Sequence, residues 1–162
     1  MSAALTSDPD DPVDLRRAAA RFATGVALVT APGGLALVVD SFVSVSLSPP
    51  LIAISPARTS LTWRRMRATG RFGVNVLGVQ HADGLRERAR PGADRLADLD
   101  IETLPDGVPI VRDALIAFRC TLEAEHEAGD HTLAVGRVRT IHHGPARAPL
   151  VFYTGRFGTF AA

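Results

Sequence analysis

The sequence has little cysteine, little excess charge and no long apolar run. Cys120 is its one cysteine, which excludes an internal disulfide and a cluster of thiolate metal ligands. Its 18 basic and 17 acidic side chains leave a formal net charge of +1, so no attraction to nucleic acid or to an anionic membrane surface is expected. The apolar runs are too short and too often interrupted to span a bilayer.

The amino-terminal stretch MSAALTSDPDDP has neither a basic region nor an apolar core, so we expect no signal peptide and a cytoplasmic protein. We predict a disordered acidic lead over residues 1–13 and a single domain over residues 14–162. The hydrophobic fraction of 46% and the charged fraction of 22% are typical of a globular domain, and 162 residues suffice to bury a core.

The chain alternates short apolar strands with turn signals, which predicts a mainly β (α+β) fold with a few flanking helices. Many strands of this kind favour an antiparallel barrel over an open sheet. The expected strands are Val26–Thr30, Leu35–Val39, a strand from Ser41 that stops at a proline pair, Leu51–Ser55, Phe72–Leu77, Ala114–His126, Thr132–His142 and Leu150–Tyr153.

Two helices are predicted outside the strands. Asp14 is expected to cap a first helix over Leu15–Ala23, and a second begins at Ser60 and ends at Gly70. The first helix is expected to pack on the body of the domain through apolar residues at helical spacing, namely Leu15, Ala18, Ala19 and Phe22.

The middle of the chain, Gln80–Asp106, is charged and poor in strand signals. Too little chain remains on either side for two separate cores. We therefore predict a short helix and an excursion loop that lies on the barrel and serves as a functional lid.

The segment SFVSVSLSPP, from Ser41, places serines among apolar residues. Alternation with period two predicts Ser44 and Ser46 on one face of a strand. A row of hydroxyl groups at a strand end suits a polar, flat ligand.

The sequence has no pattern typical of a metal site, of a hydrolase nucleophile or of a nucleotide-binding loop. The five histidines match no standard metal-ligand spacing, so no metal is expected, and no nucleophile elbow or phosphate-binding glycine loop is present. Cys120 lies between Phe118 and Leu122 in a predicted strand, so it is interpreted as a packed apolar residue.

Five segments together resemble the flavin reductase-like family of FMN-binding split barrels: LRRAAARFATGVALVT, SFVSVSLSPPLIAIS, Ser60 and Thr62 with GRFGVNVL, GDHTLAVGRV, and PLVFYTGRFG. The resemblance runs from Leu15 to near the end of the chain and depends on the order of the segments. It implies a six-stranded antiparallel Greek-key split β-barrel, a homodimer and flavin (FMN or FAD) near the subunit interface. It also implies NAD(P)H-dependent flavin reduction, with reduced flavin passed to a partner monooxygenase.

The chemistry of flavin reduction makes physical sense of several residues. Hydride transfer between two cofactors needs no protein acid or base, so the lack of a triad is no objection. Hydroxyls at the start of a helix suit a phosphate. The resemblance matches Arg95 to a basic residue near the flavin tail and His131 to the nicotinamide side. The predicted cofactor-binding residues are Ser41, Ser44, Val45, Ser46, Arg58, Ser60, Thr62, Arg95 and Tyr153, and those predicted for catalysis are His131 and Asp40.

Plainer interpretations stay open for two of these positions: Ser60 caps a helix with or without a ligand, and Asp130 with His131 shapes a hairpin. The chain also departs from the family pattern. Val38 stands where a hydroxyl is usual, and Asp40 places a carboxylate where a neutral group is usual. In the excursion, Arg88 and Leu96 stand at two positions that are usually phenylalanine.

Three functional hypotheses follow. The first is a flavin reductase. The second is a split barrel without flavin reduction, a non-redox enzyme on a small organic, secondary-metabolite-like substrate, with Asp40 and His131 as acid and base. The third is a non-catalytic subunit that binds a partner enzyme. Fold alone does not choose among them.

Overall fold

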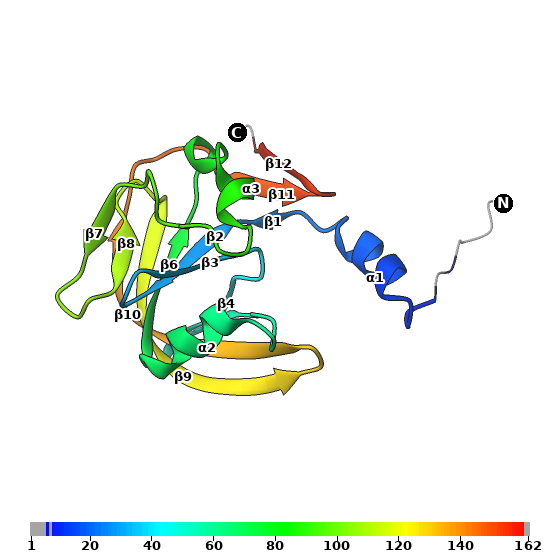
Figure 1. The fold of residues 1–162 in the computed structure, drawn as a ribbon, viewed down its shortest axis with the longest axis horizontal. Helices are drawn as coiled ribbons and strands as arrows, with labels where there is room; N and C mark the ends of the chain where they lie inside the picture. Colours follow the sequence, from blue (N-terminus) through cyan, green and yellow to red (C-terminus); the bar gives the residue numbers. More distant parts are fainter. Residues whose placement is uncertain (1–5, 7, 161–162) are drawn as a thin grey trace.

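The computed structural model describes residues 6 and 8–160, which form three antiparallel sheets and short helices (Figure 1). The main sheet has seven strands in the order β3-β2-β6-β9-β10-β5-β4. Their bounds are β2 (Ala27–Ala31), β3 (Leu35–Val39), β4 (Val43–Leu47), β5 (Pro50–Ile54), β6 (Arg71–Val76), β9 (Ile116–Ala128) and β10 (His131–His143).

Two smaller sheets and four helical segments complete the domain. One sheet has the order β1-β11-β12, with β1 (Thr24–Gly25), β11 (Leu150–Tyr153) and β12 (Arg156–Thr159), and the other pairs β7 (Ile101–Thr103) with β8 (Pro109–Val111). The helices are α1 (Pro12–Ala19), α2 (Leu61–Ala68), α3 (Leu85–Arg88) and the 3-10 turn η1 (Val79–His81). The predicted class, mainly antiparallel β with short helices, is confirmed, although the main sheet holds seven strands where six are expected.

The longest pairing is the hairpin of β9 and β10, whose thirteen-residue strands lie at the centre of the main sheet. A two-residue turn, Gly129–Asp130, joins them, and Gly129 has a φ of +62°, which glycine adopts without strain. β6 pairs with β9 on one side and β5 with β10 on the other. The hairpin therefore connects the two halves of the sheet.

The core consists of two apolar clusters. The first contains α2 side chains, because Trp63 and Met66 are buried against the sheet beside Phe72, and Trp63 meets the Phe72 ring edge-on at 5.9 Å. The second cluster joins the other end of the main sheet to β11 and to α3, and it includes Leu28, Leu77, Leu85 and Leu150.

A buried amide fixes β8 onto the main sheet. Asn75 Nδ2 donates to the carbonyl of Leu28 at 2.8 Å and to Thr30 Oγ1 at 3.2 Å, while Asn75 Oδ1 accepts from the Val111 amide at 2.8 Å. Thr30 Oγ1 in turn donates to the carbonyl of Pro109. Every polar atom of the Asn75 amide group thus has a partner in a site that water does not reach.

The excursion over Gln80–Asp106 is more ordered than expected. It contains α3 as predicted, and it also contains β7, which pairs with β8 beyond its end. His81 Nδ1 accepts from the Gly78 amide, so its Nε2 donates to Asp113 Oδ1 at 3.0 Å. Arg119 Nε donates to the Asp106 carboxylate at 2.7 Å. Both ends of the excursion are therefore bonded to residues outside it.

The prediction for the first helix is wrong in two respects. Its cap is Asp11, whose carboxylate accepts from the Val13 amide at 2.8 Å, so the helix begins at Pro12 and ends at Ala19. The helix buries no residue, and Phe22 beyond it is 76% exposed. Figure 1 shows α1 standing away from the sheets. An amphipathic pattern predicts an apolar face but not which surface covers it.

The predicted face of the serine strand is also wrong. Ser44 pairs with Ile52 and Ser46 with Leu51, so one extra residue, Val45, forms a β-bulge in β4. Because Leu51 and Ile52 point to opposite faces of β5, Ser44 and Ser46 point to opposite faces as well. The strand does stop at the proline pair, as predicted, since β4 ends at Leu47 and Pro50 opens β5.

We expect Asn75→Leu to lower the free energy of unfolding by about 2–4 kcal/mol, because it leaves the Val111 amide buried without a partner and removes the side-chain bonds to Leu28 and Thr30. Urea unfolding at neutral pH measures the change. Thr159→Ala, which removes an exposed hydrogen bond to Pro149, is the control and should cost less than about 0.5 kcal/mol. Equal effects of the two variants would contradict the role given to Asn75.

Candidate functional site

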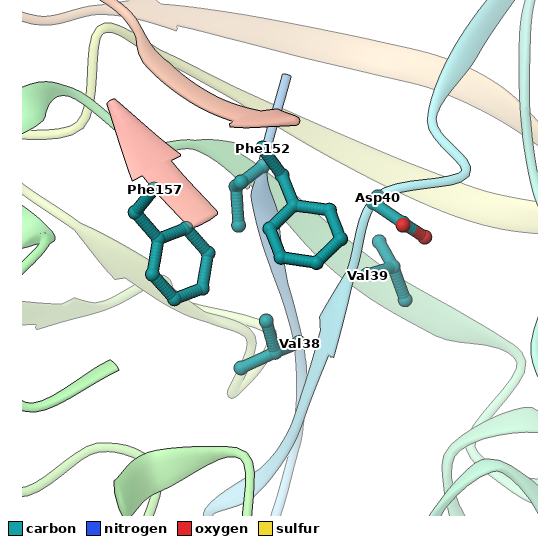
Figure 2. A pocket seen from close by; sticks show the side chains of 6 residues that line it. Val38, Val39, Asp40, Phe152 and Phe157 are labelled. Carbon is teal, nitrogen blue, oxygen red and sulfur yellow. The ribbon is translucent and has the colours of Figure 1, made fainter. Parts of the chain in front are cut away.

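A small apolar hollow of about 230 Å³ lies between the end of β3 and the β11–β12 hairpin (Figure 2). Phe152 and Phe157 supply two aromatic rings with centroids 5.3 Å apart, and Val38 lies below them. The lining residues are Val26, Val38, Val39, Asp40, Phe152 and Phe157. Such a wall suits a flat aromatic ring system.

Asp40 is the one charged side chain in that lining. It is exposed at the end of β3, and in Figure 2 its carboxylate points away from the rings of Phe152 and Phe157. Within residues 8–160 it forms no side-chain hydrogen bond and no ion pair. The mouth of the hollow therefore carries one uncompensated negative charge.

A second group of predicted residues is assembled by backbone bonds between the loop before α2 and the tip of the β9–β10 hairpin. The Thr132 amide donates to Pro56 O at 2.9 Å and the Arg58 amide to Asp130 O at 3.0 Å. Ser41 Oγ accepts from the Ser55 amide at 2.9 Å, just before this loop. This hydrogen bond holds Ser41 beside Ser55, which leads into the loop before α2.

Ser60 is the N-cap of α2, and its Oγ accepts from the Trp63 amide at 3.1 Å. The plainer interpretation of Ser60 is therefore confirmed as a structural role. A hydroxyl that accepts still has its own proton to donate, and the first amides of a helix lack partners within it. Thr62, in the first turn, is half-buried. The start of α2 retains donors for an anionic group.

The two arginines predicted for the site differ in their surroundings. Arg58 is already engaged, since its guanidinium donates to Gly129 O at 3.2 Å and lies 3.4 Å from the Glu127 carboxylate. Arg95, in the excursion, has a buried Nε that finds no partner among the described residues. A buried donor of this kind costs free energy unless a ligand or water completes it.

His131 begins β10, and its Nδ1 lies 2.7 Å from Asp130 Oδ1. This hydrogen bond, together with the charge of the ring, holds the pKa of Asp130 below its ordinary value. The His131 side chain is 45% exposed and is not among the residues that line the hollow with Asp40. The structure therefore does not bring His131 and Asp40 together in one cavity.

Tyr153 lies on the other side of β11 from the hollow. Successive side chains of a strand alternate, so Tyr153 points away from Phe152 and lines a second, open hollow of about 570 Å³ together with Ala23 and Arg156. In β4, Val45 is the bulge residue and its side chain is exposed.

Phe152 and Phe157, which form the aromatic wall of the hollow, were not predicted as site residues from the sequence. Phe152 and Phe157 stand in the quoted segment PLVFYTGRFG, whose alternation around a Thr154–Gly155 turn was the available signal. Nor was Arg86 of α3 predicted, whose guanidinium carbon lies 5.9 Å from the centroid of the Phe157 ring and which donates to Gly155 O at 3.1 Å. Arg86 thus fixes the excursion against the β11–β12 hairpin.

Within residues 6 and 8–160, no group of three or more His, Cys, Asp or Glu side chains is placed to hold a metal ion. None of the helices in that part of the chain has the length and apolar character needed to cross a membrane. Burial raises the pKa of the Cys120 thiol to about 12, in keeping with a packed core residue.

Comparison with known proteins gives matches along the whole chain. A family model described as a flavin reductase like domain matches residues 19–161. A flavin reductase of Pseudomonas putida is 35% identical over 166 residues, which cover 100% of this chain and 98% of the relative. The reductase subunit of a flavin-dependent monooxygenase from Rhodococcus jostii is 33% identical, over 95% of this chain and 80% of the relative.

A solved structure agrees with these matches. The NADH:FAD oxidoreductase of Streptomyces globisporus C-1027, in complex with NAD and FAD fragments, superposes with a TM-score of 0.90 at 35% identity. The superposition covers 98% of each chain.

Proposed function

The chain belongs to the flavin reductase-like family, and we propose that it is an NADH-dependent flavin reductase that supplies reduced flavin. The observation that carries this proposal is the full-length superposition on the NADH:FAD oxidoreductase of Streptomyces globisporus, with 98% of both chains covered. We propose FMN or FAD as the flavin and NADH as the reductant.

The side chains of this protein fit a flavin. The hollow by β3 offers an apolar, aromatic wall for a planar ring, from Val38, Phe152 and Phe157. The unpaired Nε of Arg95 and the donors at the start of α2 suit an anionic tail. The hollow thus offers apolar surface for the ring, and the donors suit the phosphate.

When bound, the flavin accepts a hydride from the reduced nicotinamide, and this chemistry belongs to the two cofactors. The protein is then required to orient two flat rings and to keep water from them. We propose that Ser60 and Thr62, with Arg95, hold the tail. We propose that Ser41 and the backbone of Ser44, Val45 and Ser46 border the ring, and that His131 borders the nicotinamide. Arg58 and Tyr153 are proposed as outer contacts.

The non-redox hypothesis has less support. It requires Asp40 and His131 to act on one substrate as acid and base, which in turn requires both within hydrogen-bond reach of it. Asp40 lines the hollow and His131 does not, and His131 is already bonded to Asp130. No observation favours this second function over flavin reduction.

We also propose that the active species is a homodimer. The hollow of about 230 Å³ is smaller than ordinary ligand pockets, which run from about 300 to 1,000 Å³. Exposed apolar side chains lie on the edge strand β4, where Leu47 is 91% exposed, and on and just after α1, at Leu15 and Phe22. A second copy that covers these surfaces would enlarge the site and remove them from water.

A partner oxygenase is proposed as the consumer of the reduced flavin. The Rhodococcus jostii relative is named as the reductase subunit of a monooxygenase, and other relatives carry the same name. An enzyme that draws on NADH works where that reductant is supplied, which favours the cytoplasm.

The central test is a titration with FMN under nitrogen, followed by NADH. We expect a saturable change in the flavin absorption spectrum and then bleaching of its visible band. Arg95→Gln should weaken FMN binding about tenfold, because one charge-assisted hydrogen bond is lost. The matched control is Arg90→Gln, an exposed arginine of the same excursion, which should bind as the wild type does. FMN that neither binds nor bleaches would contradict the proposal.

For the homodimer, sedimentation velocity should give about twice the chain mass of 17.2 kDa. Leu47→Lys should shift the protein toward monomer, because it places a charge in a covered apolar surface. Ile141→Lys changes another exposed apolar residue, at the far end of β10, and serves as the control. A wild-type monomer at micromolar concentration would contradict the dimer.

A further inference from the structure

The mouth of the hollow carries a charge whose effect on a bound flavin follows if the proposed function holds. The lining of the hollow contains five apolar side chains and one carboxylate, that of Asp40. An aspartate that water reaches is ionised at neutral pH. The charge of whatever ring enters the hollow therefore matters to its affinity.

The size of the hollow places a ligand close to Asp40. A volume of about 230 Å³ does not enclose a tricyclic ring with its tail, so part of any such ring extends beyond the lining rings of Phe152 and Phe157. Asp40 follows the last residue of β3 and lines one side of the hollow, with its carboxylate turned away from the rings of Phe152 and Phe157. A ring that enters the hollow therefore lies close to Asp40.

The charge of Asp40 is not cancelled by the protein. No side chain within residues 8–160 forms an ion pair or hydrogen bond with it. Arg86 lies over the Phe157 ring and donates to Gly155 O, and it is not among the lining residues. An unpaired charge beside a low-dielectric wall acts on a bound ring more strongly than it would in open water.

The two redox forms of a flavin differ in charge. In the proposed reaction one hydride, with its electron pair, passes from NADH to the oxidised flavin, which gives NAD⁺ and reduced flavin. The oxidised ring is neutral, and the hydride brings one proton and two electrons, so the reduced ring that forms carries one negative charge. A fixed carboxylate has little effect on the neutral oxidised ring and repels the negatively charged reduced ring.

We infer that Asp40 makes the site prefer oxidised over reduced flavin and so promotes release of the product. Its carboxylate is a positioning charge rather than a catalytic residue. Departure of reduced flavin is what a protein that hands it to another enzyme requires. The hollow binds the substrate by its apolar wall and weakens the product's binding through a single charge.

The test compares the dissociation constants of oxidised and reduced FMN, measured by quenching of tryptophan fluorescence. The reduced FMN is prepared beforehand with dithionite, and both titrations are done under nitrogen. Asp40→Asn should tighten the binding of reduced FMN about tenfold, which corresponds to about 1.4 kcal/mol. The binding of oxidised FMN should change less than about twofold. The difference between the variants should shrink as salt is added, because the effect is electrostatic.

Two further variants separate charge from other effects. Asp40→Glu keeps the charge and should retain the wild-type ratio of the two dissociation constants. Asp98→Asn removes an exposed charge elsewhere and should leave the ratio unchanged; Asp98 has a φ of +60°, which asparagine also adopts readily.

The possible results separate the role of Asp40 from the proposed function. A ratio that is the same in the wild type and in Asp40→Asn, with FMN bound by both, overturns the role of Asp40 and leaves the proposed function intact. A wild type that binds neither form of FMN overturns the proposed function and this inference with it.

Discussion

The antiparallel pairing of β9 with β10 is the interaction on which the rest of the structure depends. These two strands hold β6 on one side and β5 on the other, so both halves of the main sheet are attached to one hairpin. The tip of the hairpin binds the loop before α2 through the amides of Arg58 and Thr132. The position of the α2 N-terminus, and of the donors that it presents, follows from the register of this hairpin.

The site that results has two unlike parts. One is an apolar hollow with an aromatic wall. The other, proposed for the anionic tail, consists of the donors at the start of α2 and the unpartnered Nε of Arg95. Neither part contains an acid and base arranged around a nucleophile. This division suits a protein that positions a ring and a charged tail and leaves the electron transfer to its cofactors. Asp40 adds a charge to an otherwise apolar hollow, and the redox state of the ring decides what that charge does.

The features that depend on residues close together in the chain could be predicted from the sequence. The N-cap at Ser60, the Gly129–Asp130 turn and the strand before Leu77 follow from residue types within a few positions, and the structure confirms them. The bulge at Val45 could not be predicted, because it depends on the register with β5. The packing of α1 was predicted wrongly, because an apolar face does not identify its cover. The hollow draws on three separated segments, so composition gave no sign of it.

A crystal structure of the protein with FMN bound would test the central claim most directly. The account predicts the flavin ring against Phe152, Phe157 and Val38, with one edge beside Asp40 and the phosphate toward α2 and Arg95. A second chain is expected to cover the part of the ring that the hollow leaves exposed. Flavin bound in another cavity, with this hollow empty, would contradict the assignment of the site and the role given to Asp40.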